Sequence, residues 1–197
     1  MSAREQNPHQ DKGLVLVLQD LQAASPAQLR SKSSDEAAQD YCWSALGLSA
    51  AFGFRGAPGH TYYLYLSERR WQLSLISPQE WGQRLHGAFV AHCQLRHDMT
   101  WSLIFDPSVA EGSVVHDALL QYLAGIRSQL DESGSWEALL RQGERHLPYQ
   151  QRVLTTALSS SLRQSLALSG QSGVPLSVPL LKDAISLTET APDASND

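Results

Sequence analysis

The 197-residue sequence has few of the residues that hold small folds together covalently or through metal ions. It contains two cysteines, Cys42 and Cys93, which are too few for a disulfide framework and are not spaced as a zinc-binding pair. Both lie among apolar neighbours, and this setting predicts buried free thiols in a reducing compartment. We therefore expect no disulfide, no bound metal and no other cofactor.

The sequence also lacks a long hydrophobic run. Its longest strictly aliphatic stretch runs from Leu14 to Leu18, whereas a helix that spans a membrane needs about 20 apolar residues. The N-terminal segment MSAREQNPHQDKG contains no apolar stretch of signal-peptide length. These absences predict a cytoplasmic protein that has no membrane partner.

Basic residues are the minority among the charged ones. The 15 Lys and Arg are outnumbered by 20 Asp and Glu, and the formal net charge is −5. Because nucleic acids and anionic membrane surfaces are bound by positive fields, we expect neither as a partner. The C-terminal residues 183–197 contain four acids and no Lys or Arg. We predict that residues 188–197 form a disordered acidic tail.

What the sequence does contain is an alternation of apolar and polar residues between about residues 59 and 106. This pattern is typical of β-strands, whose successive side chains point to opposite faces of a sheet. The predicted strands span residues 61–66, 71–76, 89–95 and 100–105. Short polar connections between them predict a four-stranded antiparallel meander. We expect seven large side chains on its apolar face: Trp71, Leu73, Leu75, Phe89, Leu95, Trp101 and Leu103.

Apolar residues at helical spacing flank this segment on both sides. The predicted helices span about residues 14–24, 34–52, 113–130, 135–140 and 148–168. Ser34 or Asp35 has the residue type of an N-cap for the second of them. A small sheet cannot remove its apolar face from water alone, so helices have to cover it. We predict a single α+β domain over residues 1–187, an antiparallel four-stranded meander packed against flanking helices, with a strand-rich core at about 59–106 and a helical second half at about 113–170.

The motif Ser77-Pro78-Gln79-Glu80-Trp81-Gly82 lies between the second and third predicted strands. A serine followed three residues later by glutamate, with a proline in the first turn, is typical of a capped one-turn helix. We interpret the motif as a capped turn in which Trp81 covers the edge of the sheet and Gly82 adopts a positive φ angle. The alternative is that Glu80 and Trp81 line a ligand groove.

Several residues around the predicted strands occur at the distances found in a known family. They are Gly59, Tyr62-Tyr63-Leu64-Tyr65, the segment Ile76 to Gly82, Phe89, Leu95, His97-Asp98 and Thr100-Trp101-Ser102. Over about residues 59–102 the chain resembles DUF2452, a family of domains of unknown function in bacterial and animal proteins. The resemblance implies that the strand-rich segment is a structural unit, and it implies no activity, cofactor or ligand.

His92, Cys93, His97 and Asp98 are close together in the sequence and could suggest a metal site or a catalytic thiol. His92 and Cys93 are adjacent on a predicted strand, so their side chains point to opposite faces. His97 and Asp98 lie in a loop, where an Asp side chain commonly accepts hydrogen bonds from nearby backbone amides. We therefore expect a turn cap rather than a metal site. The sequence also lacks nucleophile, phosphate-loop and dinucleotide motifs, so we predict no catalytic residue.

Two tyrosines of the first predicted strand, Tyr63 and Tyr65, share the face opposite Tyr62 and Leu64. If Tyr62 and Leu64 join the core, Tyr63 and Tyr65 face outward. Three roles are open for these two outward rings: cover by the helices of the second half, contact with a partner protein, and stacking on nucleic-acid bases. The acidic charge of the chain disfavours the third role.

These patterns favour a non-enzymatic protein-binding or scaffold module that docks an unknown protein partner or a second copy of itself. The candidate binding surface consists of Tyr63, Tyr65, Glu80, Trp81, His97 and Asp98. The apolar segment from Val174 to Leu187 is a second candidate for docking. The alternative is a small-molecule-binding protein or enzyme with a pocket near Glu80, His97 and Asp98, which requires these three residues to converge on one cavity.

Overall fold

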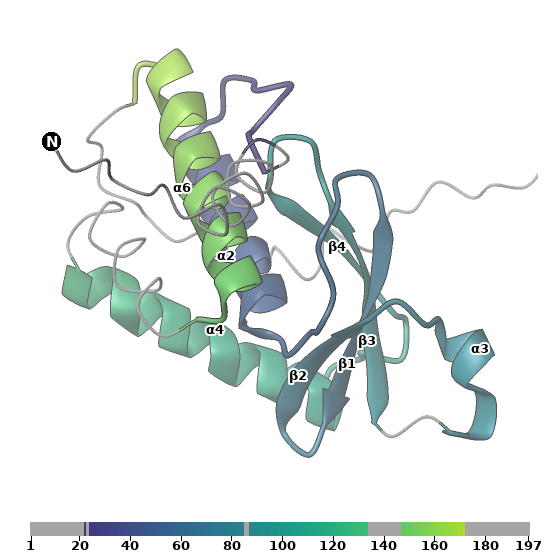
Figure 1. The fold of residues 1–197 in the computed structure, drawn as a ribbon. Coiled ribbons are helices and arrows are strands. Elements are labelled where there is room, and N and C mark those ends of the chain that lie inside the picture. The colour runs from purple at the N-terminus through teal and green to yellow at the C-terminus, as the bar shows by residue number, and fades with distance from the viewer. Residues whose placement is uncertain (1–21, 23, 85–86, 134–146, 172–197) are drawn as a thin grey trace, which may run out of the picture.

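The computed structural model (Figure 1) describes residue 22 and residues 24–84, 87–133 and 147–171. The predictions for residues 135–140, 174–187 and 188–197 lie outside these residues, as does most of the helix predicted at 14–24. The elements in chain order are α2 (Ser34–Ser49), β1 (Thr61–Ser67), β2 (Arg70–Ser74), α3 (Pro78–Trp81), the 3-10 turn η1 (Gly82–Arg84), β3 (Ala88–Leu95), β4 (Trp101–Phe105), α4 (Val114–Ser133) and α6 (Tyr149–Leu168).

The four strands form one antiparallel sheet in the order β2-β1-β3-β4. The predicted α+β class and the four-stranded antiparallel sheet are therefore confirmed. The sequential strand order of a meander is wrong, because β3 pairs with β1 instead of β2. The other edge of β2 is already occupied: Ala51 N–H donates to the Trp71 carbonyl at 2.9 Å, and Leu73 N–H donates to the Ala51 carbonyl at 3.0 Å. The chain between β2 and β3 therefore passes β1, and it contains α3 and η1.

Helices α2, α4 and α6 lie on one face of the sheet, whereas α3 lies on the opposite side (Figure 1). One cluster of buried hydrophobic residues joins the sheet to all three long helices, so helices from both flanks cover the apolar face, as predicted. Helix α2 makes the closest approach. The Trp101 N–H donates to the Ser44 hydroxyl at 2.9 Å, and a Cβ atom on Gly47 would lie only 3.3 Å from the Trp101 ring.

Only some of the residues expected on the apolar face lie there. Four of them, Leu73, Leu95, Trp101 and Leu103, are buried, and Trp71 is partly buried against the same core. The other two expectations are wrong. Leu75 follows the end of β2 and is 56% exposed.

Phe89 lies on the opposite face because β3 contains a β-bulge. Leu64 pairs with Ala91, but the next residue of β1, Tyr65, pairs with Phe89. Val90 is therefore an extra residue, and Val90 and Ala91 are both completely buried. An extra residue reverses the alternation on one side of the bulge. Phe89 consequently shares a face with Tyr65.

Helix α2 begins one residue after its cap. Ser33 is the N-cap, and Ser33 and Glu36 form a reciprocal capping box, so the predicted caps Ser34 and Asp35 are close but wrong. Trp43 is buried although it lies off the main apolar stripe, and its ring meets that of Phe105 edge-on at 5.2 Å. The helix is buried on more than one side, as expected from its position between the sheet and α6. Among the helices that the structure describes, none combines the length and apolar character needed to cross a membrane.

Candidate functional site

Tyr63 and Tyr65 lie on the face of the sheet away from the long helices. Tyr65 is only 3% exposed, because its ring packs 5.5 Å from that of Phe89 and its hydroxyl donates to the Ile76 carbonyl at 2.8 Å. Burial raises the pKa of Tyr65 to about 12, with smaller contributions from Tyr63 and Glu80. The prediction that helices of the second half cover this ring is therefore wrong, because the chain segment after β2 covers it. Tyr63 stays half-buried.

Glu80 and Trp81 belong to the short helix α3. The Ser77 N–H donates to Glu80 Oε2 at 2.8 Å, and the Glu80 N–H donates to Ser77 Oγ at 3.3 Å. These bonds lower the pKa of the Glu80 carboxyl. Trp81 is half-buried, and Gly82 has a φ angle of +51°. The predicted capped turn with its positive-φ glycine is confirmed.

Asp98 caps the turn between β3 and β4. Its Oδ1 accepts hydrogen bonds from the Thr100 N–H at 3.1 Å and the Thr100 hydroxyl at 2.6 Å, as the sequence predicted. Its Oδ2 accepts a bond from Lys32 Nζ at 2.6 Å, which the sequence did not predict. Burial opposes ionisation of Asp98, but the bonds from Lys32 and Thr100 outweigh it and lower its pKa. The neighbouring His97 side chain is exposed.

Glu80 and Asp98 are held by different partners in the described structure. Glu80 is held by Ser77 and Asp98 by Lys32 and Thr100, and none of the predicted residues Glu80, His97 and Asp98 lines the large cavity described below. Within residues 24–84, 87–133 and 147–171, no group of three or more His, Cys, Asp and Glu side chains is arranged to hold a metal ion.

The two cysteines are buried free thiols, as predicted. Burial raises the pKa of Cys42 to about 12 and also raises the pKa of Cys93. Because the thiolate is the reactive form, neither thiol is poised as a nucleophile at physiological pH.

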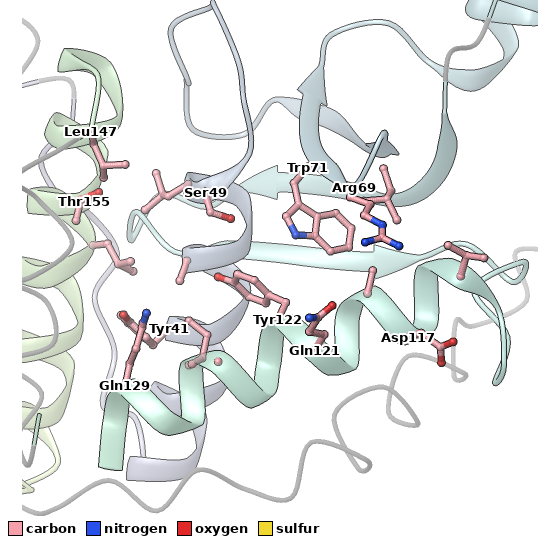
Figure 2. A pocket seen from close by; sticks show the side chains of 18 residues that line it. Tyr41, Ser49, Arg69, Trp71, Asp117, Gln121, Tyr122, Gln129, Leu147 and Thr155 are labelled. Carbon is pink, nitrogen blue, oxygen red and sulfur yellow. The ribbon is translucent and has the colours of Figure 1, made fainter. Parts of the chain in front are cut away.

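A cavity of about 760 Å³ lies between α2, α4, α6 and the β1–β2 hairpin (Figure 2). The sequence did not predict this cavity. The apolar residues among the described ones that line it are Ala45, Leu48, Leu66, Trp71, Val114, Ala118, Gly125, Ile126, Leu147 and Leu158. The polar ones are Tyr41, Ser49, Arg69, Asp117, Gln121, Tyr122, Gln129 and Thr155. The sequence signal that could have indicated it is the set of small residues, Ala45, Ala118 and Gly125, on helices that face the sheet.

Aromatic and hydroxyl groups form the middle of the cavity. The rings of Trp71 on β2 and Tyr122 on α4 meet edge-on, with centroids 6.4 Å apart. Ser49 is a hydrogen-bond partner of the Tyr122 phenol, and burial raises the pKa values of Tyr122 and Tyr41 above the ordinary range. Both phenols are therefore neutral near pH 7, where a neutral hydroxyl can donate and accept hydrogen bonds.

The two ends of the cavity differ in chemistry. Figure 2 shows Arg69 and Asp117 toward one end and Leu147 and Thr155 at the other. Arg69 comes from the β1–β2 hairpin and is exposed to solvent. The charged side chains of the described lining thus lie toward the hairpin end, whereas exposed lining residues such as Ser49 and Gln129 occur along the rest of the cavity.

Strands β1 to β4, the capped helix α3 and the β3–β4 turn with Asp98 form the unit that the sequence motifs mark. Residues 39–111 match the model of DUF2452, a family described as protein of unknown function. The DUF2452 match confirms the resemblance seen over residues 59–102 and extends it into α2. The match includes the cavity residues of α2 and the hairpin, whereas those of α4 and α6 lie beyond it. No solved structure matches the chain.

Proposed function

We propose that this chain is a non-enzymatic binding protein that holds a small, mainly apolar molecule in the cavity between α2, α4, α6 and the β1–β2 hairpin. The volume of about 760 Å³ falls within the range of about 300–1,000 Å³ that is usual for small-molecule sites. The lining also has the usual composition of such sites, since apolar side chains predominate and a few hydroxyls and amides are placed among them.

The observation that carries this proposal is the size of the hollow between the three long helices and the hairpin. The hollow is partly open to solvent, since Ser49, Gln121 and Gln129 of its lining are exposed. Here Ala45, Ala118 and Gly125 occupy positions on the cavity wall where larger apolar residues would close the space. A bound molecule would fill this volume and remove its apolar lining from water.

The chemistry of the lining supports binding rather than catalysis. The phenols of Tyr41 and Tyr122 have raised pKa values because they are buried, so they are poor general acids at neutral pH. Asp117 is the one acid among the described residues of the lining, and its side chain is 72% exposed. The described residues of the lining include no Cys and no His that could serve as the nucleophile and the base of covalent catalysis.

This proposal takes the second of the two functions that the sequence suggested and places it at a different site. The sequence suggested a pocket near Glu80, His97 and Asp98, whereas the proposed site is the cavity between α2, α4, α6 and the β1–β2 hairpin. Protein docking through the outer face of the sheet stays a prediction, and one observation favours it: Ile104 on the outer strand β4 is 60% exposed. The cytoplasmic location also stays a prediction.

A fluorescence titration with the neutral apolar dye N-phenyl-1-naphthylamine tests the proposal. We expect saturable binding of one dye molecule to the purified protein. The variant Ala118→Trp places a large side chain in the cavity wall and should weaken dye binding at least about tenfold. Ala124→Trp is the matched control, because Ala124 is exposed on the same helix and does not line the cavity.

Two results would overturn the proposal: no saturable binding to the wild-type protein, or equal dye affinity of the wild-type and Ala118→Trp proteins. Circular dichroism and thermal unfolding establish that each variant is folded. If Ala118→Trp fails to fold, Ala45→Leu fills the same cavity from α2 and replaces it in the comparison.

A further inference from the structure

We infer that the ligand is a monocarboxylic acid with an apolar body, and that Arg69 at the hairpin end of the cavity binds its carboxylate. This inference rests on the proposed function, because it names the ligand class of the same cavity. It starts from the backbone of the hairpin that carries Arg69.

Strands β1 and β2 are joined by a two-residue loop of Glu68 and Arg69. Ser67 pairs with Arg70 across the end of the ladder, and the φ angles of Glu68 and Arg69 are +48° and +62°. Positive φ at both loop positions is the geometry of a type I′ turn, for which Asn-Gly is the usual sequence. L-residues with a side chain adopt this region at an energetic cost, so this loop is strained at two consecutive positions.

No side-chain hydrogen bond or ion pair of Glu68 or Arg69 offsets that strain in the described part of the chain. Backbone strain that local contacts do not explain is concentrated at functional sites. The turn instead places the Arg69 side chain at the mouth of the cavity, beside Trp71 and across from Gln121 on α4 (Figure 2).

The charged residues around the cavity indicate that Arg69 is the group to which an anion would bind. Among the described residues that line the cavity, Arg69 is the one with a basic side chain and Asp117 the one with an acidic side chain. The Asp117 carboxylate is 72% exposed, and Figure 2 shows it pointing away from the Arg69 guanidinium. The lining residues of α2 and α6 carry no formal charge at neutral pH.

A carboxylate fits this position better than it fits the interior. A guanidinium offers two parallel N–H donors that match the two oxygens of a carboxylate. At the mouth, the carboxylate keeps part of its hydration, so the cost of burying its charge is smaller than in the interior. The apolar body of the ligand then extends past Trp71 and Leu66 toward Leu158 and Leu147, where the lining is apolar.

Displacement of N-phenyl-1-naphthylamine by decanoate and by decanol tests the inference, because these two ligands differ only in the head group. We expect the wild-type protein to bind decanoate about 5- to 10-fold more tightly than decanol. This preference should shrink as the salt concentration rises, since an exposed ion pair is screened.

Two turn variants separate the role of the guanidinium from that of the strain. Arg69→Gly suits a type I′ turn and removes the guanidinium, so it should raise the melting temperature and abolish the preference for decanoate. Glu68→Asn relieves the first strained position and keeps Arg69, so it should raise the melting temperature and preserve the preference.

The outcomes separate the inference from the proposed function. If the dye binds but the wild-type protein binds decanoate and decanol equally, or if Arg69→Gly keeps the preference, the inference is overturned and the proposed cavity stands. If the dye and both decyl compounds fail to bind the wild-type protein, the proposed function is overturned, and the inference falls with it.

Discussion

The ammonium group of Lys32 lies 2.6 Å from Oδ2 of Asp98, which is 66 positions further along the chain. The Lys32 side chain is completely buried, and its Nζ also donates to Asp40 Oδ2 at 2.6 Å. Arg96 binds the other oxygen of Asp40. Two cations and two anions therefore balance one another where the segment before α2 meets the turn between β3 and β4.

Removal of the Lys32 charge should destabilise the fold strongly. We expect Lys32→Met to lower the free energy of unfolding by about 3–5 kcal/mol, because two partly buried carboxylates lose their shared cation. Urea unfolding of the purified variant measures this change. Arg30→Met is the control, since Arg30 and Glu36 form an exposed pair with side chains 57% and 46% accessible and should cost less than about 1 kcal/mol. Equal losses for the two variants would contradict the prediction.

The lowered pKa of Asp98 predicts a dependence of stability on acid. The folded-state pKa lies below the ordinary value of 3.8, so the ionised carboxylate stabilises the fold fully above that value. This contribution is lost as the pH falls through the folded-state pKa. We expect the difference in unfolding free energy between the wild-type protein and Asp98→Asn to be constant above about pH 5 and to shrink below 3.8. A difference that stays unchanged down to pH 2.5 in urea titrations would contradict this.

Gly87 should tolerate no side chain. Its φ angle is +138°, and a Cβ atom there would lie 2.6 Å from the Leu66 carbonyl oxygen, which belongs to the rigid backbone of β1. We expect Gly87→Ala to destabilise the protein by about 2 kcal/mol or more in thermal or urea unfolding. Gly53→Ala is the matched control, because nothing lies within 4 Å of its added Cβ atom. A Gly87→Ala protein as stable as this control would show that β1 and β3 can separate there.

Two neighbouring residues of β4 should respond in opposite ways to the same charge. Leu103 is 7% exposed and Ile104 is 60% exposed. We expect Leu103→Asp to cost about 3 kcal/mol or more, because it buries an unpaired carboxylate, and Ile104→Asp to change the free energy of unfolding by less than about 1 kcal/mol. Thermal unfolding of both variants checks the assignment of the two faces.

The stable Ile104→Asp protein then tests self-association through the outer face of the sheet. Light scattering should give a lower mass for this variant than for the wild-type protein if that face joins two copies. Equal masses for the two proteins would exclude self-association through Ile104.

The sequence predicted those parts of the fold whose signal lies within a few neighbouring residues. Alternation revealed the four strands, and the spacing of Ser77 and Glu80 revealed the cap of α3. The bulge at Val90 was not visible, because a run of apolar residues does not show which of them is unpaired, and Phe89 was therefore assigned to the wrong face.

The features that the sequence did not reveal depend on residues far apart in the chain. Lys32 is buried because of partners 8 and 66 positions away, and a lysine between polar residues gives no local sign of this. The strand order depends on Ala51, which follows a helix and bonds to β2. The cavity likewise forms only when α4 and α6 pack beside α2.

Helix α2 and the residue pair that follows it touch both outer strands, through Ser44 at the Trp101 N–H of β4 and through Ala51 at β2. One segment thus contacts both edge strands of the sheet, β2 and β4, to which strands of another molecule could add. Local unfolding of α2, without unfolding of the whole protein, would expose the edges of β2 and β4 together. Aggregation of this protein under mild heating should therefore track the integrity of that helix rather than the melting of the sheet.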